Sequence, residues 1–164
     1  MVDLCIVRNL AQYCIYDMSE YMGWTCNKHG IYEGCGDLPD YWKKPHHYPY
    51  LIYVGTEIAG FAAVRRAPHE EETMDVGEFF VARTYKGKGI GREIAVQLFR
   101  QFPGKWLVRV IAGNTGAVCF WEKVINEFTK GAVVRTAEVY VDPYSGTYQS
   151  AFFRFRSNAS IGSG

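Results

Sequence analysis

Three glycines at alternate positions, interleaved with basic residues, form the segment of the chain best suited to chemistry. The segment reads Lys86-Gly87-Lys88-Gly89-Ile90-Gly91-Arg92. Glycine has no Cβ atom, so its backbone can turn sharply and approach a ligand closely. The residues that follow have the pattern of a helix, and the first N–H groups of a helix have no partner within it. Together with the nearby cations, these N–H groups predict a binding site for a diphosphate or a similar anion.

Two common phosphate-binding motifs do not fit this segment. A loop for nucleoside triphosphates needs Ser or Thr after Gly-Lys to hold magnesium, whereas Gly91 precedes Arg92 and Glu93. A dinucleotide-binding loop needs G-x-G-x-x-G and an acidic residue about 20 positions later. This segment is G-x-G-x-G, and the later strand offers Arg109 and Ile111 instead. A glycine-rich turn without a ligand is the remaining alternative, which three cations at a helix start disfavour.

The elements that must position this loop follow from the spacing of apolar residues. Spacings of three and four predict amphipathic helices, and short apolar runs between turn residues predict strands. The loop lies between a strand and a helix that Pro103-Gly104 ends, and another strand follows. A strand, a helix and a strand in that order form a unit with two parallel strands and a right-handed crossover. We expect helices at 4–22 and from residue 90, and strands at 51–54, 58–65, 75–82 and 106–111.

The remaining elements flank this unit. Asn114 is a good helix cap, and Ala117, Phe120, Trp121 and Val124 share one face of the helix that would follow. Residues 132–140 and 148–156 alternate like a closing hairpin. Residues 23–50 are rich in glycine, proline, histidine and aromatic side chains, which predicts a long loop with one short helix at 40–43.

This order of motifs resembles the GNAT acetyltransferase superfamily, whose signature is Arg or Gln, two residues, Gly, one residue, and Gly or Ala. Lys86 stands at the first position of that signature. The helix after Asn114 is similar to the second coenzyme A-binding helix of the family, and the resemblance is strongest from residue 51 to about 130. It implies an α/β fold with a mixed, mostly antiparallel sheet, a parallel strand pair splayed open to hold CoA, and flanking helices.

The resemblance also implies a cofactor, acetyl-CoA, and the residues that bind it. The pantetheine arm would pair with the main chain of residues 79–81, and an N–H group near Val81 would stabilise the developing oxyanion. The implied cofactor-binding residues are Phe79, Phe80, Val81, Lys86, Gly87, Lys88, Gly89, Ile90, Gly91, Arg92, Asn114, Ala117, Phe120 and Trp121.

N-acetyl transfer to a primary amine of a small molecule or peptide, by direct attack, is the activity that the resemblance implies. A lysine-like amine must first lose a proton, which costs about 4.6 kcal/mol at pH 7 for a pKa of about 10.4. Glu78 is the first candidate for the base and Asp75 the second, and an ion pair across the sheet is the alternative role of Glu78.

Trp121 stands where the family usually has the tyrosine that protonates the departing thiolate. Either Tyr85, Tyr140 or another tyrosine supplies this proton, or water does. Trp121 itself is expected to pack against the CoA arm or the core. A catalytically silent CoA-binding or regulatory module is therefore the alternative function. An acyl-enzyme at Cys119 is disfavoured because the family transfers the acetyl group directly.

Composition limits the class of protein and its partners. The chain has 164 residues, 48% of them hydrophobic, which predicts one domain over residues 1–156 and a flexible polar tail over residues 157–164. Eighteen basic and seventeen acidic residues nearly cancel without forming blocks, which argues against nucleic acid or a membrane as a partner. No apolar run approaches the roughly 20 residues that cross a bilayer, so we expect a soluble protein.

Three smaller features complete the expectations. Five cysteines without metal-type spacing or a secretory leader favour reduced thiols in the cytoplasm, with a Cys26–Cys35 disulfide as the disfavoured alternative. The pair His46-His47 lacks further ligands, so no metal is expected and the two side chains would line a pocket or the surface. Glu70-Glu71-Glu72 could attract a cationic amine but fits a solvated turn better.

The amino terminus departs from the family pattern. GNAT chains begin with a strand before the first helix, and residues 1–3 leave little room for one. The first strand is therefore expected to be short or missing. A missing strand would expose a sheet edge that a second copy of the chain could cover, so a homodimer is expected as a possible assembly.

Overall fold

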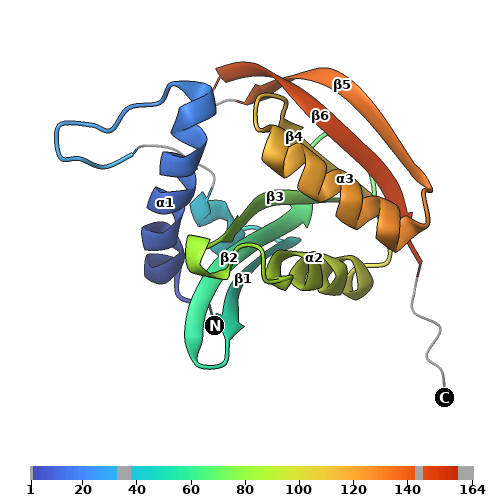
Figure 1. Cartoon of the computed structure of the whole chain (residues 1–164), viewed down its shortest axis with the longest axis horizontal. Helices are drawn as coiled ribbons and strands as arrows, with labels where there is room; N and C mark the ends of the chain where they lie inside the picture. Colours follow the sequence, from blue (N-terminus) through green and yellow to red (C-terminus); the bar gives the residue numbers. More distant parts are fainter. Residues whose placement is uncertain (1, 33–37, 143–145, 159–164) are drawn as a thin grey trace.

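A six-stranded sheet with one helix on one face and two on the other makes up the protein (Figure 1). The structure is a computed structural model that describes residues 2–32, 38–142 and 146–158. The strands are β1 (His47–Val54), β2 (Glu57–Arg66), β3 (Thr73–Val81), β4 (Gly104–Ile111), β5 (Val133–Asp142) and β6 (Gly146–Ser157). The helices are α1 (Leu4–Met22), α2 (Ile90–Gln101) and α3 (Thr115–Thr129), with short 3₁₀ helices η1 (Leu38–Trp42) and η2 (Arg83–Tyr85).

The strand order β1-β2-β3-β4-β6-β5 contains one parallel pair, β3 with β4, and all other neighbours are antiparallel. The mixed sheet predicted from the sequence is thus confirmed. The parallel pairing joins 73–76 to 105–108 and ends there, although β3 continues to Val81 and β4 to Ile111. The two strands therefore diverge at their carboxyl ends, and the sheet is open between them.

A β-bulge in β3 lies at the point where this opening begins. On β2, Ala63 pairs with Glu78 and the next residue, Val64, pairs with Val76, so Gly77 is the extra residue. In a regular strand the side chains of residues 75 and 77 would share a face. The bulge shifts this alternation by one residue, so Glu78 faces the same side of the sheet as Asp75.

The two faces of the sheet carry separate hydrophobic clusters. Helices α2 and α3 cover a large aromatic core in which Phe99, Trp106 and Phe153 are almost completely buried. Helix α1 covers the other face through Val7 and Ala11, which pack with Phe61 and neighbouring apolar side chains. The face under α1 is the one that carries Glu78 and Asp75.

Helix α1 has the bounds that the apolar spacing predicts. Its N-cap is Asp3, whose Oδ1 accepts a hydrogen bond from the Cys5 N–H (2.7 Å), and Gly23 ends the helix at φ 66°. No strand precedes α1 among the described residues, and β1 lies at one edge of the sheet. Whether a second copy covers this edge stays a prediction. No helix in the described ranges is both long and apolar enough to cross a membrane.

Most strand boundaries differ by one to four residues from the sequence prediction, and the start of β1 and the end of β6 have identifiable causes. Strand β1 begins at His47 rather than at residue 51, because Pro49 is tolerated on an edge strand, where one row of N–H groups needs no partner. Strand β6 includes Ser157, which pairs with Gly104 and donates a hydrogen bond to the Phe99 carbonyl. Strand β6 thus includes the first residue of the segment predicted as a tail. The rest of the predicted tail from residue 159, and Cys35 with its alternative disulfide, lie outside the described residues.

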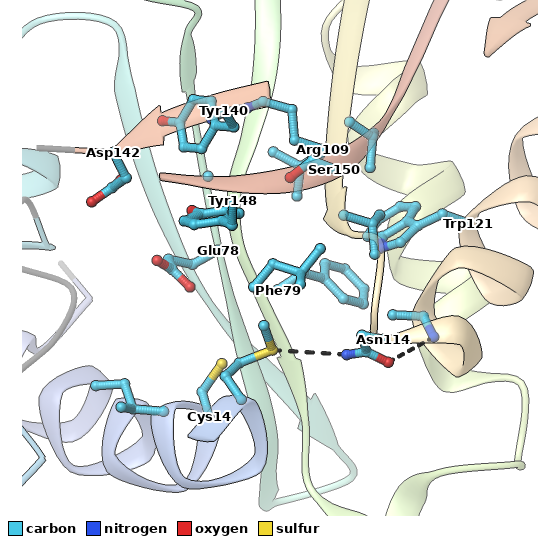
Figure 2. Close-up of a pocket in the computed structure, with 18 of the residues that line it drawn as sticks. Cys14, Glu78, Phe79, Arg109, Asn114, Trp121, Tyr140, Asp142, Tyr148 and Ser150 are labelled. Atoms are coloured by element: carbon cyan, nitrogen blue, oxygen red, sulfur yellow. Dashed lines mark hydrogen bonds between the residues drawn. The ribbon is translucent and has the colours of Figure 1, made fainter. Parts of the chain in front are cut away.

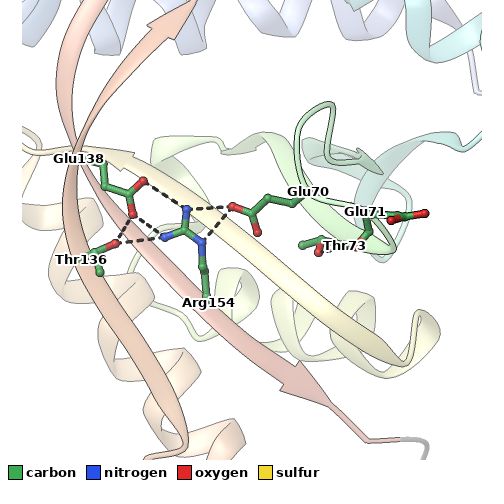
Figure 3. Close-up of polar contacts among 6 residues, drawn as sticks. All are labelled: Glu70, Glu71, Thr73, Thr136, Glu138 and Arg154. Carbon is green, nitrogen blue, oxygen red and sulfur yellow. Dashed lines mark hydrogen bonds and ion pairs between the residues drawn. The ribbon is translucent and has the colours of Figure 1, made fainter.

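A group of ion pairs fastens the β2–β3 turn to the closing hairpin (Figure 3). Arg154 on β6 pairs with Glu70 (2.8 Å) from the turn and with Glu138 on β5. The hydrogen bonds to Glu138 raise the pKa of Arg154, and Glu70 raises it further, against the opposing effect of burial. Glu70 therefore has a structural partner, whereas Glu71 and Glu72 are exposed, as a solvated turn predicts.

Candidate active site

A wide groove of about 710 Å³ runs between α1, the glycine loop and the start of α3. It gathers most of the residues that the sequence assigned to cofactor binding, from three separate parts of the chain. The predicted residues that line it are Phe79, Phe80, Val81, Lys86, Gly87, Gly89, Gly91, Arg92, Asn114, Ala117, Phe120 and Trp121. Lys88 and Ile90 do not line it. Ile90 instead packs with Ile52 and Val81 in a small apolar cluster.

The glycine loop has a backbone that ordinary residues rarely adopt. Gly87 has φ 76° and Gly89 has φ 82°, and no atom lies within 4 Å of the position that a Cβ atom would take at either residue. Gly89 is the N-cap of α2, so the first N–H groups of that helix lie beside the loop. An open surface bordered by such N–H groups fits the diphosphate of coenzyme A.

The cations of the loop have partners of their own. Lys86 pairs with Asp17 on α1 (3.1 Å), and Arg92 pairs with Glu127 on α3 (2.9 Å). The Lys88 ammonium lies over the Tyr85 ring, 5.7 Å from its centroid. The side-chain charges are thus shared with neighbouring groups, and the main chain is the feature of the loop best placed to bind an anion.

Asp17 fastens α1 to this side of the groove. Burial raises the pKa of its carboxyl, but hydrogen bonds from Arg83 and Lys86 outweigh burial and hold the pKa below its ordinary value. The two cations lie 66 and 69 residues further along the chain, so no local pattern in the sequence could indicate this contact.

Aromatic side chains form the inner wall of the groove. The Phe79 ring lies 5.0 Å from that of Trp121 and 6.3 Å from that of Phe120. Trp121 is only 6% exposed and belongs to the core under α2 and α3, which confirms its expected packing role. A Cβ atom on Gly91 would lie 3.2 Å from the Phe120 ring, so this glycine lets the loop approach α3.

Asn114 caps α3 as the sequence predicts. Its Oδ1 accepts a hydrogen bond from the Ala117 N–H (3.0 Å), and its Nδ2 lies 3.7 Å from the Met18 sulfur on α1 (Figure 2). The capping amide thus also contacts the helix on the far side of the groove.

A narrow pocket of about 230 Å³ adjoins the groove and lies on the α1 face of the sheet. The two cavities share part of their lining, so they meet at the opening between β3 and β4. The shared residues are Cys14, Met18, Phe79, Asn114, Ala117 and Trp121. Glu78 lines only the narrow pocket, and Figure 2 shows its carboxylate next to Tyr148.

Asp75, the second candidate base, does not line either cavity. It is fully buried beside the narrow pocket, where its Oδ2 binds Arg65 (3.3 Å) and Arg109 (2.5 Å). Burial lowers the pKa of Arg109, but the charge of Asp75 and the interactions with Tyr140 together outweigh it, so that the pKa lies above its ordinary value. The Arg109 guanidinium also lies 4.2 Å from the centroid of the Tyr140 ring.

The tyrosines considered as proton donors lie in different places. The Tyr85 hydroxyl donates to Glu57 (2.5 Å), and this contact raises the pKa of Tyr85. Tyr140 and Tyr148 line the narrow pocket with ring centroids 5.5 Å apart. His46 and His47 line neither cavity: His46 is exposed, whereas His47 is half-buried with its ring centroid 5.0 Å from that of Tyr41. The described residues hold no group of side chains suited to a metal ion.

Cys14 faces both cavities from α1, opposite Glu78 (Figure 2). Burial raises the pKa of the Cys14 thiol, and the nearby charges of Glu78 and Asp17 raise it further, against a smaller lowering by Lys86. The thiol therefore stays protonated near neutral pH.

Several residues of the narrow pocket were not predicted, among them Arg65, Ser150 and Asp142. For some of these residues, the alternation of side-chain directions along a strand was the available sequence signal. Ser150 and Tyr148 are two residues apart on β6, so they share one face of the sheet. Nothing in the sequence indicated that this face borders the opening between β3 and β4.

Comparison with known proteins identifies a family that this chain matches. The sequence profile of the Acetyltransferase (GNAT) family matches residues 13–126. No curated protein matches the chain by sequence.

Solved structures resemble the chain in fold at low sequence identity. They include the ribosomal-protein-S18-alanine N-acetyltransferase of Escherichia coli (12% identity, TM-score 0.58, covering 82% of this chain and 84% of that one). A point mutant of the spermidine N-acetyltransferase SpeG of Vibrio cholerae has 14% identity and a TM-score of 0.59, covering 94% and 90%. A Bacillus subtilis acetyltransferase in complex with CoA has 11% identity and a TM-score of 0.55, covering 74% and 84%.

The profile spans more than half of the chain, and the open parallel pair, the glycine loop and the capped α3 agree with it. The chain belongs to the GNAT acetyltransferase family, whose cofactor is acetyl-CoA.

Proposed function

We propose that this protein transfers an acetyl group from acetyl-CoA to a primary amine of a small molecule or peptide by direct attack. The observation that carries the proposal is the junction of the wide groove with the narrow pocket, which has Glu78 on the pocket side. A donor bound in the groove and an amine bound in the pocket would meet there without passing through an acyl-enzyme.

The groove suits coenzyme A in two respects. The N–H groups of the glycine loop and the start of α2 would hold the diphosphate, and the wall of Phe79, Phe120 and Trp121 would border the pantetheine arm. The bound cofactor supplies an acetyl group activated as a thioester.

The main chain of β3 supports an oxyanion site near Val81. The Ala82 N–H donates to the Ala59 carbonyl on β2 (2.8 Å), and N–H groups alternate in direction along a strand. The Val81 N–H therefore points away from β2, toward the opening. Removal of a single donor of this kind costs about 3–4 kcal/mol of transition-state stabilisation in other enzymes.

Glu78 is the base that we assign. The ammonium form of the acceptor gives one proton to Glu78 or to a water that it binds, and the neutral nitrogen forms the new C–N bond as the C–S bond breaks. The nitrogen then loses a second proton, and the thiolate takes one up. Tyr148 and Tyr140 are the tyrosines placed to supply it, and water is also adequate for a thiol with a pKa of about 8.5. We assign Asp75 to holding Arg65 and Arg109 rather than to base catalysis.

Thiol release with acetyl-CoA across a panel of primary amines tests this function. Glu78→Gln is expected to lower kcat by about 10²- to 10⁴-fold at pH 7, and the rate should partly recover at high pH, where the amine is already neutral. Glu72→Gln, on the exposed β2–β3 turn, is the matched control and should not change the rate. Tight CoA binding without turnover on any amine would contradict the proposal and favour the silent CoA-binding module, which the buried Trp121 in place of a tyrosine suggests.

A further inference from the structure

The narrow pocket carries charges of both signs, arranged at different ends. Figure 2 shows the carboxylates of Glu78 and Asp142 on one side of the pocket, while Arg109 and Ser150 lie apart from them on the other. These side chains come from four strands and share the α1 face of the sheet. A single small ligand in this cavity would contact both ends.

Two arginines and one carboxylate lie together at the Arg109 end of the pocket. Arg65 and Arg109 both line the pocket, and the carboxylate of Asp75 lies between them. The side chains of the two arginines are only 11% and 12% exposed, so water screens their charge weakly. A guanidinium group can only donate hydrogen bonds, so Arg109 can bind an anionic group but offers no acceptor to a cationic one.

Two polar atoms at this end have no hydrogen-bond partner within the described part of the chain. They are Arg109 Nε, which can only donate, and Ser150 Oγ, which can donate or accept. Ser150 is 1% exposed and lines the pocket. Buried polar groups in native proteins almost always have partners, so a ligand oxygen or an ordered water is expected at both atoms. Asp75 Oδ1 also lacks a partner but does not line the pocket.

We propose that the acceptor is a small zwitterion of the amino-acid type, whose amine lies toward Glu78 and whose carboxylate binds Arg109 Nε and Ser150 Oγ. The proposal rests on the N-acetyl transfer proposed above and narrows its substrate class. A cavity of about 230 Å³ is below the roughly 300–1,000 Å³ of sites for drug-sized ligands, which fits a molecule of this size. A polycationic amine would place a second positive charge beside Arg65 and Arg109.

The first test compares acceptors that differ only in the carboxylate. Thiol release is measured with acetyl-CoA and the twenty standard amino acids, their amides, and the polyamines putrescine and spermidine. At least one amino acid is expected to exceed its amide by about tenfold or more in kcat/KM, as for the loss of a hydrogen bond to a charged group. Equal rates for amide and acid, or a preference for polyamines, would overturn the zwitterion proposal while leaving N-acetyl transfer standing. No turnover with any amine would instead mean that the proposed function itself is wrong.

The second test removes the two unpartnered donors separately. Ser150→Ala leaves the ion pairs of Asp75 intact, and Arg109→Lys keeps the charge but removes Nε. Each variant should raise KM for the amino acid by about tenfold and lower the ratio of kcat/KM for the amino acid to kcat/KM for its amide by a similar factor. Calorimetric binding of the N-acetylated amino acid to the free protein should weaken by a similar factor. An unchanged KM and an unchanged binding constant in Ser150→Ala would show that these atoms bind only water, and the proposal would be wrong.

Discussion

The wide groove and the narrow pocket meet at one opening in the sheet, yet different kinds of chemical group line them. The groove presents N–H groups of a glycine loop and rings that pack into the core. The pocket presents charged and hydroxyl side chains from strands that are held in place by buried ion pairs. The cofactor side thus depends mainly on backbone shape, and the acceptor side depends on which side chains the strands carry.

This difference has a consequence for substitution. A side chain in the pocket can change without any change of backbone, which would alter the acceptor and leave the groove intact. A change at a glycine of the loop alters the backbone itself. The two regions should therefore respond separately to mutation, which the following measurements can test.

The largest effect is expected in the pocket, from Asp75→Asn. This change removes the buried carboxylate that pairs with both Arg65 and Arg109 and should lower the free energy of unfolding by about 3–5 kcal/mol. Urea denaturation of the variant and of the wild type gives the difference. Asp40→Asn, which breaks the exposed pair with Lys44, is the control and should leave the free energy of unfolding nearly unchanged. Similar losses of stability in both variants would show that the buried ion pairs of Asp75 contribute no more than an exposed pair.

The next effect is expected in the groove, from Gly89→Leu. A side chain at φ 82° strains the backbone and extends into the space where the diphosphate would lie, so CoA should bind about 100-fold more weakly, which is about 2.7 kcal/mol. Gly55→Leu is a matched control, since Gly55 has φ 61°, has equally open surroundings and lies in the β1–β2 turn. Calorimetric titration with CoA separates the two variants. Equal affinities would mean that the loop does not bind the cofactor.

The Cys14 thiol lines both the groove and the pocket, so its alkylation rate reports on the boundary between them. Because burial and the charges of Glu78 and Asp17 raise its pKa, Cys14 should react with iodoacetamide at pH 8 roughly tenfold more slowly than the exposed Cys26. Glu78→Gln removes one of these charges and should speed the reaction of Cys14 alone. Mass spectrometry of the alkylated peptides measures both rates, and an unchanged Cys14 rate in the variant would place the Glu78 charge too far away to matter.

The smallest effect is expected at Asp17, which joins α1 to the groove. Its pKa is lowered in the folded protein, so its contribution to stability is present above the unfolded pKa of about 3.9 and disappears as the pH falls through the folded value. Asp17→Asn should cost about 0.2–1 kcal/mol at pH 7, since Arg83 and Lys86 are largely exposed. Chemical denaturation of both proteins at several pH values gives the difference, which should vanish in strong acid. A constant difference across that range would rule out the ion pairs as its cause.

The groove could be predicted from the sequence because its parts are local. The alternating glycines of the loop and the cap at Asn114 each lie within a few residues of the helix that they begin. The predicted bounds of α1 also followed from local spacing. The ends of the strands were harder to predict. Strand β1 can include Pro49 only because it lies at the edge of the sheet, which is a property of the whole fold.

The pocket could not be predicted in the same way because its parts are distant. Ser150 and Arg109 approach each other only through the pairing of β6 with β4. Glu78 was identified by its place near the expected opening, but the face to which its side chain points depends on the bulge at Gly77. Hydrophobic patterns indicate which residues form a strand better than they indicate an irregularity within it.

The bulge at Gly77 also bears on how the chain reaches its native fold. A competing pairing of β3 without the bulge would turn Glu78 toward the core under α2 and α3 and would move Phe79 to the α1 face of the sheet. An unpaired carboxylate in an apolar core is strongly unfavourable, so such a misfolded register would be rejected during folding. The carboxylate that we assign to catalysis would thus also ensure that the strand carrying it folds in only one register.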